Sequence, residues 1–390
     1  MGIIRDLFQV AKVRIIFMAD QNTLLIKLVE NIKCWGRDLG FQQIGISRAD
    51  MQSEQQHLDE WLKKGYQGQM QWMENSRNLR LNPDQLHPGT IRVISARVDY
   101  QPPDTTPIKI LKSPQKAYIS RYALGRDYHK LIRKRLSTLA LQIQQWCQDH
   151  LPEYPVLQRP FADSAPVLER PFARNAGLGW IGKHTLLLDA NAGSWFFLGE
   201  IYTNLPLPET TKMIANRCGD CSACLNVCPT DAFPRPYQLD ASRCISYLTI
   251  EYRGIIPEQF REPMGNRVFG CDDCQLVCPW NKYAKPTCEK DFHPRHKLES
   301  SDLLTLFNWD EKTFLEKTAG SPIRRIGYEN WQRNLAIGLG NAPSDTEIIR
   351  SLEKKQKTAT ELVVEHINWA LQQQKTPDRK RTRKIKNASN

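Results

Sequence analysis

The chain has 390 residues, of which 41% are hydrophobic, so it is long enough for two domains with sizeable cores. No apolar run approaches the roughly 18 residues of a membrane-spanning helix, so no membrane association is expected. The formal net charge of +12 suggests a polyanionic partner, with nucleic acid first. A generally basic surface without a specific partner is the alternative.

The first residues do not match a signal peptide. Arg5, Lys12 and Arg14 interrupt every apolar stretch, and no small-residue cleavage site follows. Residues 1–19 are therefore interpreted as a short extension, or as the product of a start codon placed ahead of a true start at Met18. Without a secretion signal, the eleven cysteines are expected in a reducing, cytoplasmic compartment, as metal ligands rather than disulfides.

Helices and strands are intermixed over residues 20–205, which predicts an α+β or α/β domain. Apolar residues at helical spacing predict helices over residues 24–39, 53–64, 128–150 and 166–176. Alternating or short apolar runs predict strands over residues 41–47, 92–100, 184–188 and 195–203.

The composition changes after residue 205. Cysteine and proline dominate residues 217–290, and such a segment needs bound metal to hold its fold. A second domain is therefore expected over residues 206–295. Residues 296–370 are helical again and resemble one or two helical-hairpin repeats. Residues 371–390 are rich in Lys and Arg and are expected to form a disordered basic arm, or a solvated tail without a partner.

Eight of the eleven cysteines lie in two runs and one isolated position. The first run has the spacing C-x2-C-x2-C-x3-C-P, as in bacterial two-cluster ferredoxins. The second, C-x2-C-x3-C-P, supplies three thiolates, and Cys244 is the obvious eighth ligand for two 4Fe–4S cubanes. The last cysteine of each run is expected to cross to the other cluster. One cluster is then expected on Cys218, Cys221, Cys224 and Cys278. The other is expected on Cys228, Cys244, Cys271 and Cys274.

Zinc is the alternative to iron–sulfur clusters. Zinc sites usually show paired C-x2-C knuckles separated by a longer spacer, commonly with histidines. The runs here end in Cys-Pro and contain no histidine, so clusters are favoured. Of the remaining cysteines, Cys34 and Cys147 lie within predicted helices and are expected to be small core residues.

Gly177, Gly179 and Gly182 match the G-x-G-x-x-G pattern of a dinucleotide site. Such a site must follow a strand and open a helix. The predicted order is the reverse, so a nucleotide site is rejected. The glycines are instead expected to end a helix and to let the backbone approach something closely, such as a bulky cofactor.

Four further motifs accompany the cysteine runs. They are R-Y-A-L-G-R-D-Y-H over residues 121–129, D-S-A-P-V-L-E-R over residues 163–170, G-L-G-W-I-G-K-H over residues 177–184 and G-S-W-F-F-L-G-E over residues 193–200. Together with the cysteines, they closely resemble the epoxyqueuosine reductase family, over roughly residues 20–340. This family contains cobalamin-dependent iron–sulfur enzymes of tRNA queuosine biosynthesis.

The resemblance implies an α+β chain in three parts. Residues 20–205 would form an N-terminal α/β cobalamin-binding domain like that of reductive dehalogenases, residues 206–295 a ferredoxin-like two-cluster domain, and residues 296–370 a HEAT-like helical segment. The implied reaction reduces an epoxide on the modified wobble base of tRNA, with cobalamin attacking carbon, which clusters cannot do. The implied partners are the tRNA anticodon loop and an electron donor such as a flavodoxin or ferredoxin, and a monomer is expected.

The resemblance also implies that Asp163 is the proton donor. A carboxyl must be protonated at neutral pH for this role, so a desolvated pocket that raises its pKa is expected. Capping of the helix near Pro166 is a compatible alternative. Glu169 is expected to pack or pair on the helix surface, and His184 to be a structural histidine.

Contacts to cobalamin and RNA are expected from residues near these motifs and in the C-terminal segment. The cobalamin candidates are Arg80, Arg126, Asp163, Lys183, Leu187 and Leu198. The alternative for the two arginines is surface ion pairing. The alternative for Lys183 is simple exposure to solvent, and that for the two leucines is core packing. The RNA candidates are Arg324, Arg325, Trp331 and Arg333. Helical packing of Trp331 is slightly favoured over an RNA contact.

Two other functions compete with epoxide reduction. A corrinoid reductive dehalogenase would share the cofactors, but such enzymes typically carry a twin-arginine export signal, which residues 1–19 do not show. A non-catalytic iron–sulfur electron carrier would not need a domain as long as residues 20–205. Epoxyqueuosine reduction is therefore the favoured function.

Overall fold

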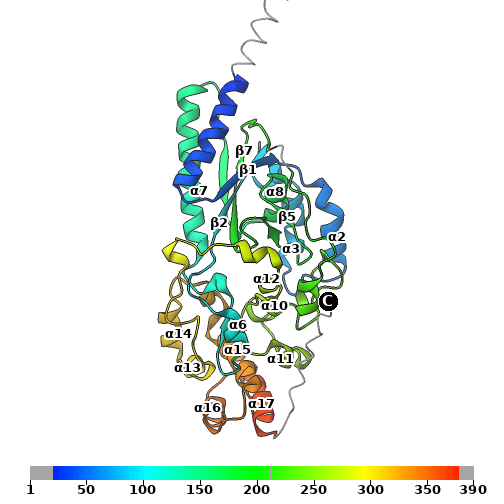
Figure 1. Ribbon diagram of the computed structural model, residues 1–390, viewed down its shortest axis with the longest axis vertical. Coiled ribbons are helices and arrows are strands. Elements are labelled where there is room, and N and C mark those ends of the chain that lie inside the picture. Colours follow the sequence, from blue (N-terminus) through cyan, green and yellow to red (C-terminus); the bar gives the residue numbers. More distant parts are fainter. Residues whose placement is uncertain (1–20, 211–212, 377–390) are drawn as a thin grey trace, which may run out of the picture.

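The computed structural model describes residues 21–210 and 213–376 (Figure 1). The predicted extension over residues 1–19 lies outside these ranges, and so does most of the predicted basic arm. In Figure 1, an upper half built on a sheet stands on a lower half made mainly of helices. Among the described residues, we find no helix that has both the length and the apolar character to span a membrane.

A four-stranded sheet forms the centre of the upper half. Its strands follow the order β1 (Gln43–Arg48), β2 (Arg92–Asp99), β7 (Phe196–Thr203) and β4 (Gln158–Phe161). Every neighbouring pair is antiparallel, so the domain is α+β. The predicted strands over residues 41–47, 92–100 and 195–203 are confirmed to within two residues at each end.

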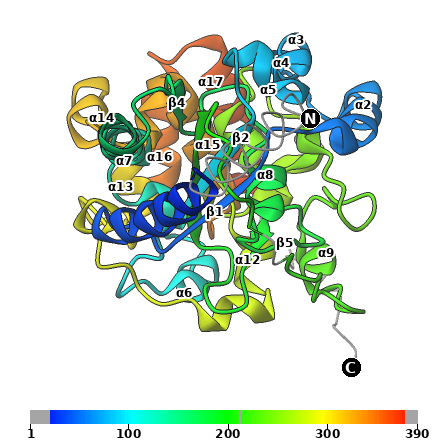
Figure 2. The same ribbon diagram turned by 90° about the horizontal axis from the view of Figure 1, so that it is seen from above.

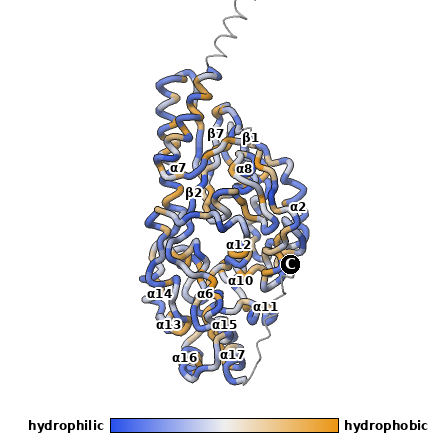
Figure 3. Tube along the Cα trace, viewed as in Figure 1, coloured by the Kyte–Doolittle hydropathy of each residue, from blue (hydrophilic) through white to orange (hydrophobic). Residues whose placement is uncertain are grey.

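One face of the sheet is covered by two long helices. These are the helix over residues 21–38 and α7 (Tyr128–His150), which has the predicted bounds. Ile132 and Leu136 of α7 pack over Gly199, where an added Cβ would lie 2.8 Å from each side chain. Only glycine therefore lets α7 lie this close to β7. Figure 3 shows hydrophobic and hydrophilic residues alternating along α7, as expected for a helix with one buried face.

The other face is covered by α8 (Glu169–Asn175). An added Cβ at Gly45 of β1 would lie 2.0 Å from the backbone oxygen of Ala176, so α8 also lies close to the sheet. The helix begins later than the predicted residue 166, because residues 162–168 form tight turns. In these turns Ser164 N–H donates to Ala162 O at 2.7 Å, and Val167 N–H donates to Ala165 O at 2.8 Å.

A two-stranded ribbon follows α8. It pairs β5 (Trp180–Ile181) with β6 (Leu187–Leu188) in antiparallel register. The predicted strand over residues 184–188 is therefore shorter than expected. Thr185 has a φ of +68°, a left-handed conformation that is incompatible with a strand.

Short helices make up most of the remaining structure. Ahead of the cysteine runs they are α2 (Gln55–Lys63), α3 (Trp72–Asn75), α4 (Arg77–Leu81), α5 (Pro83–Leu86) and α6 (Pro107–Leu111). Within the cysteine-rich segment they are α9 (Ala223–Val227), α10 (Ile245–Ile250), α11 (Glu258–Met264) and α12 (Asp273–Leu276). After it come α13 (Leu303–Phe307), α14 (Glu311–Lys317), the 3-10 turn η6 (Pro322–Ile326), α15 (Gly327–Asn341), α16 (Thr346–Gln356) and α17 (Glu361–Lys375).

The cysteine-rich segment and the C-terminal helices share one hydrophobic core. Leu248 of α10 and Val268 of β8 (Arg267–Phe269) belong to the same buried group as Leu335 of α15. The strand β8 also pairs in parallel with β3 (Tyr118–Ile119), from the first half of the chain. The segment that carries the cysteines is therefore held by apolar packing on neighbouring elements.

Two of the RNA candidates belong to this core instead. Trp331 and Arg333 of α15 are both 0% exposed. Arg333 donates hydrogen bonds to the backbone oxygens of Leu248, Tyr252 and Gly254 at 2.8–3.0 Å. The expected RNA contacts of these two residues are wrong, because α15 is buried on all sides, and the packing alternative for Trp331 is confirmed.

Replacing Trp331 with alanine is expected to lower the free energy of unfolding by about 3–5 kcal/mol, the usual cost of truncating a buried Trp. Denaturant unfolding of the full chain measures this loss. The matched control is Leu141→Ala, since Leu141 of α7 is 66% exposed. That exposed change should shift the free energy by no more than about 0.5 kcal/mol. Equal small effects of both substitutions would contradict the buried position of Trp331.

The two helical cysteines differ in burial. Cys147 of α7 is buried, as predicted, but Cys34 is exposed. The prediction for Cys34 is wrong because the helix over residues 21–38 buries the face that carries Leu28 and Ile32, and position 34 lies on the opposite side.

Candidate active site

Asp163 lies on the loop between β4 and α8. Its φ of +53° is a left-handed conformation that is uncommon for residues other than glycine. The loop is held by Glu169, whose Oε1 accepts the backbone N–H of Asp163 at 2.8 Å. The Asp163 side chain is 42% exposed, so its carboxylate is accessible to a substrate.

Two side chains from the first turn of α7 hold the Asp163 carboxylate. Tyr128 OH donates to Oδ2 at 2.5 Å, and His129 Nε2 lies 2.9 Å from the same oxygen. The other ring nitrogen of His129 lies 2.6 Å from Asp127 Oδ1, so the imidazole bridges two carboxylates. Asp127 also caps α7 by accepting the backbone N–H of His129 at 3.0 Å. The start of the helix and the site are thus built by the same residues.

The proton of this group resides on the histidine at neutral pH. Burial alone would lower the pKa of His129, but hydrogen bonds and charge attraction from Asp127 and Asp163 outweigh it and raise the pKa to about 9. Burial alone would raise the pKa of Asp163, but hydrogen bonds from His129 and Tyr128 and the charge of Arg325 lower it. The expected raised pKa of Asp163 is therefore wrong, because a cationic partner stabilises the carboxylate.

The raised carboxyl pKa belongs to Glu169 instead. Burial raises it to about 8, and the negative charge of Asp163 adds to the effect. Glu169 is therefore part of the site and does more than pack on the helix surface. Asp163 does not cap α8, because the helix begins at Glu169 and has no side-chain cap.

A second buried acid lies on the sheet beneath α8. Glu200 of β7 is 0% exposed, and neither carboxyl oxygen has a hydrogen-bond partner among the described residues. Its pKa lies well above the usual value because of burial, with Glu169 and Asp163 adding to the effect. Sequence reasoning missed Glu200, because a strand motif gives no sign of which face an acid occupies.

Aromatic rings fix the position of Tyr128. Its ring stacks on Phe197 of β7 with a centroid distance of 3.9 Å and an angle of 10°. Phe197 in turn packs against Phe292 and Tyr122, with centroid distances of 5.2 and 6.5 Å. These contacts hold the hydroxyl group that donates to Asp163.

The first set of cysteines surrounds one cavity. Cys218, Cys221, Cys224 and Cys278 line a space of about 300 Å³, with Trp280 at its edge. Three of these cysteines come from the first run and one from the second, because α9 and α12 lie against each other. This is the set that the crossover of ligands predicts for one cluster.

All four cysteines of the second set are half-buried. Burial raises the pKa of the Cys274 thiol, and the neighbouring Cys244 and Cys228 raise it further. Cys244 has the same effect on Cys271. The cysteines that act on Cys244, Cys271 and Cys274 are thus members of the same predicted set. The structure thus sorts the eight cysteines into the two predicted sets, and their role as cluster ligands remains a prediction.

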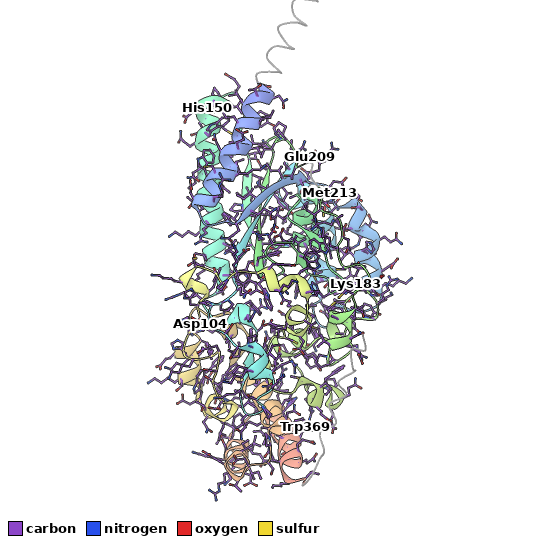
Figure 4. All side chains as sticks on the ribbon, viewed as in Figure 1. Asp104, His150, Lys183, Glu209, Met213 and Trp369 are labelled. Atoms are coloured by element: carbon purple, nitrogen blue, oxygen red, sulfur yellow. The ribbon has the colours of Figure 1, made fainter. Side chains whose placement is uncertain are left out.

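Three of the cobalamin candidates lie near α8 or near the first cysteine set. Lys183 Nζ donates to the backbone oxygen of Gly219 at 2.6 Å, beside the cysteine cavity (Figure 4). Leu187 is buried and Leu198 half-buried in one apolar group under α8. Both the cofactor role and core packing remain compatible with these positions.

The two arginine candidates lie apart from each other. Arg126 is 57% exposed and pairs with Asp291 at 3.2 Å, as its surface alternative predicts. Arg80 is only 6% exposed, and it donates to Ser76 Oγ and to the backbone oxygen of Val167, both at 3.2 Å. Arg80 therefore braces the loop that carries Asp163, and its contact with cobalamin remains a prediction.

The glycines of the G-x-G-x-x-G motif allow close packing between neighbouring segments of the chain. Gly177 ends α8 with a φ of +74°, and the ribbon of β5 and β6 follows, so the rejection of a nucleotide site is supported. An added Cβ at Gly179 would lie 2.1 Å from the backbone oxygen of Leu188. The glycines were expected to let the backbone approach a cofactor closely. At Gly179 the backbone instead lies close to β6.

Two buried nitrogens beside this ribbon have no partner among the described residues. They are Trp180 Nε1 and His184 Nε2. Nδ1 of His184 accepts the backbone N–H of Leu186 at 3.1 Å, so Nε2 carries the proton of the neutral ring. Burial lowers the pKa of His184 to about 4, which keeps the ring neutral. Only one ring nitrogen of His184 thus has the structural partner that was expected. Among the described residues, two N–H donors, Trp180 Nε1 and His184 Nε2, are left without a partner.

The α+β domain, its exposed acid group and the two cysteine sets together define an iron–sulfur oxidoreductase. Residues 217–281 match the family described as 4Fe-4S double cluster binding domain, and residues 80–164 match the family described as epoxyqueuosine reductase QueG. These matches favour clusters over zinc. The chain belongs to the epoxyqueuosine reductase family, as its relatives show.

Curated relatives cover nearly the whole chain. The epoxyqueuosine reductase of Pseudomonas aeruginosa is 55% identical over 345 residues, which are 88% of this chain and 94% of the relative. The enzyme of Escherichia coli is 52% identical over 350 residues, which are 90% of each chain. The oxidoreductase class and the resemblance inferred from the motifs are therefore confirmed.

Solved structures agree with this assignment. An epoxyqueuosine reductase bound to an epoxyqueuosine-modified tRNA-Tyr stem loop has a TM-score of 0.81 and 26% identity, over 90% of this chain and 92% of that chain. A Bacillus subtilis epoxyqueuosine reductase, with its catalytic aspartate loop swung out of the active site, gives the same values. The predicted fold class is confirmed by these likenesses.

Proposed function

We propose that the chain reduces epoxyqueuosine to queuosine at the wobble position of tRNA. The observation that carries this proposal is the Tyr128–Asp163–His129 group, an accessible carboxylate beside an imidazolium, in a chain that also holds eight cysteines in two sets. Opening the epoxide and releasing its oxygen as water consumes two electrons and two protons. A pure electron carrier would have no use for the proton-holding group.

The chain's own residues supply one of the two protons, and solvent supplies the other. His129 holds one at neutral pH and contacts Asp163 directly at 2.9 Å. Asp163 receives this proton and donates it to the oxygen that leaves the substrate carbon. Tyr128 and Glu169 keep the carboxylate in place, through its Oδ2 and its backbone N–H respectively.

The eight cysteines would hold two 4Fe–4S clusters, which would supply one-electron transfer from an external donor such as a flavodoxin or ferredoxin. Cobalamin, when bound, would supply a low-valent metal nucleophile, chemistry that the clusters lack. The residues fit such a cofactor, since the half-buried Leu198 continues the apolar group of Leu187, and the buried donors Trp180 Nε1 and His184 Nε2 have no partner among the described residues and suit the amides of a corrin rim. Lys183, Arg80 and Arg126 remain the further candidates.

Anticodon-loop RNA is the proposed polyanionic partner, and the C-terminal segment offers it two arginines. Arg324 and Arg325 of η6 are exposed, and Arg325 pairs with Glu251. The charge of Arg325 acts on both Asp163 and Tyr122, so this arginine lies near the site. A cytoplasmic monomer is part of the same proposal.

The proposal is tested by anaerobic purification with added cobalamin, followed by an assay on tRNA that carries the epoxide. Formation of queuosine is expected. If a preparation that contains both clusters and cobalamin forms no queuosine, the proposed reaction is rejected. The assignment of the fold and of the clusters would be unaffected by that result.

Turnover is expected to fall as the pH rises through about 9, because His129 then loses the proton that Asp127 and Asp163 hold on it. Turnover numbers at saturating RNA, measured across this range, give the profile. His129→Gln should lower turnover and remove this limb of the profile. The control His150→Gln, at the other end of α7, should keep it (Figure 4). A wild-type profile that stays flat through pH 9 would contradict a proton held on His129.

A further inference from the structure

One large aromatic side chain stands exposed beside the candidate site. Trp72 of α3 is 51% exposed, whereas Trp180, Trp195 and Trp331 are almost wholly buried. Figure 2 shows α3, α4 and α5 grouped at the edge of the molecule. An exposed Trp is costly in a folded chain and commonly marks a surface that contacts a partner.

A hydrogen bond holds the backbone of Trp72, and Arg80 contacts its ring. Its backbone oxygen accepts the N–H of Ser76 at 3.2 Å, and the hydroxyl of Ser76 accepts a hydrogen bond from Arg80 Nε at 3.2 Å. The guanidinium carbon of Arg80 lies 5.3 Å from the centre of the Trp72 ring, within the range of a cation–π contact. One side of the ring is therefore supported, while about half of the residue's surface remains free.

The same contacts connect Trp72 to the loop that carries Asp163. Arg80 donates to the backbone oxygen of Val167, four positions after Asp163. On the other side, Gln69, three residues ahead of Trp72, accepts the backbone N–H of Arg253 at 3.2 Å through its Oε1. Arg253 in turn donates to the backbone oxygen of Ile326 at 3.0 Å.

This chain of contacts ends at Arg325, the residue before Ile326. The Arg325 side chain is 53% exposed, and its charge lowers the pKa of Asp163. Trp72, Arg325 and Asp163 are thus exposed side chains on segments that these hydrogen bonds join, although they come from three distant parts of the sequence. An aromatic ring, a cation and an accessible carboxylate on joined segments match the chemistry of a nucleotide next to a reacting base.

We propose that Trp72 is a stacking platform for an unpaired nucleobase adjacent to the reacting nucleoside, with Arg325 binding a phosphate of the same strand. The inference rests on the proposed function, since it concerns the same RNA. Single-stranded bases are recognised by stacking on aromatic rings, and every base offers a flat face for this. Loss of such a stack weakens binding by about 5- to 150-fold, from 1–3 kcal/mol per base.

The test measures binding of an unmodified anticodon stem loop to the full-length holoenzyme. Trp72→Ala should raise the Kd by about 5- to 150-fold, and Trp72→Tyr should restore most of the affinity, because a tyrosine ring can also stack. Leu141→Ala, which removes an exposed apolar side chain far along α7, should leave the Kd unchanged. On epoxide-carrying RNA, Trp72→Ala should raise KM with little change in kcat.

Direct contact has its own readout. Stacking should quench part of the tryptophan fluorescence on RNA binding, and this part should be missing in Trp72→Tyr. Wild-type affinity in Trp72→Ala would overturn the inference, and so would equal losses in the Ala and Tyr variants, which would show that a ring is not what matters. If wild-type enzyme binds the stem loop but forms no queuosine, the proposed reaction fails while the platform stands.

Discussion

Asp163→Asn is expected to lower turnover by about 10²–10⁴-fold, the usual contribution of a positioned proton donor. Asparagine keeps the size of the side chain and tolerates the φ of +53° at this position, but it cannot pass on the proton of His129. Turnover of epoxide-carrying RNA at saturation measures the loss. Iron and sulfide content should stay at the wild-type level, because Asp163 belongs to neither cysteine set, and cobalamin content should stay because asparagine keeps the size and the polarity of the side chain.

The chain offers a closely matched control for this change. Asp104, in the loop between β2 and α6 (Figure 4), is also exposed and has a φ of +54°. Asp104→Asn therefore makes the same chemical change at the same backbone conformation, and it should leave turnover unaffected. Near-normal turnover in Asp163→Asn would remove this residue as the donor, whereas equal losses in both variants would indicate a general effect of the substitution.

Paired cysteine substitutions test whether the last cysteine of each run binds the other run's cluster, and a large loss of iron is expected. Cys278→Ala should remove one cluster and about half of the iron, since a cubane needs four thiolates. Adding Cys218→Ala should cost no further iron, because both residues line the same cavity. Adding Cys228→Ala instead should remove nearly all of it. Iron and acid-labile sulfide of anaerobically isolated protein give these values.

The control for the cysteine series is Cys288→Ala, an exposed cysteine outside both sets. It should keep the full iron content. The crossover would be contradicted if Cys218→Ala and Cys278→Ala together removed both clusters, since the two residues would then serve different ones. Stoichiometric zinc without sulfide would reject the clusters themselves.

Local pattern was enough to locate several elements. The helix α7 has the predicted bounds, because its apolar residues repeat at helical spacing and Asp127 supplies an N-terminal cap. The strands β2 and β7 were found from alternation and apolar character. Predictions failed where the backbone turns within an apolar stretch, as at Thr185, because a single left-handed residue leaves no periodic signal.

For the site, too, some features were predicted from local pattern and others were not. Spacing alone paired the cysteines into two sets, since a cubane imposes its ligand geometry on the local chain. The pKa of Asp163 was predicted to be raised, but it is lowered. The reason is its contact with His129, which lies 34 positions earlier in the sequence. The residues Glu200 and Trp72 were missed, because burial of an acid and exposure of a ring are both properties of the packed molecule.

The sequence by itself determined the family and the two-cluster cysteine motif, because these depend on residue types at fixed spacing, and it predicted Asp163 as the proton donor. Only the tertiary structure decided that α15 buries Trp331 and Arg333, that β6 fills the space beside Gly179, and that His129 holds the proton. The physical reason is that burial, close approach and charge coupling arise between segments far apart in the chain. Such contacts exist only once the chain is folded.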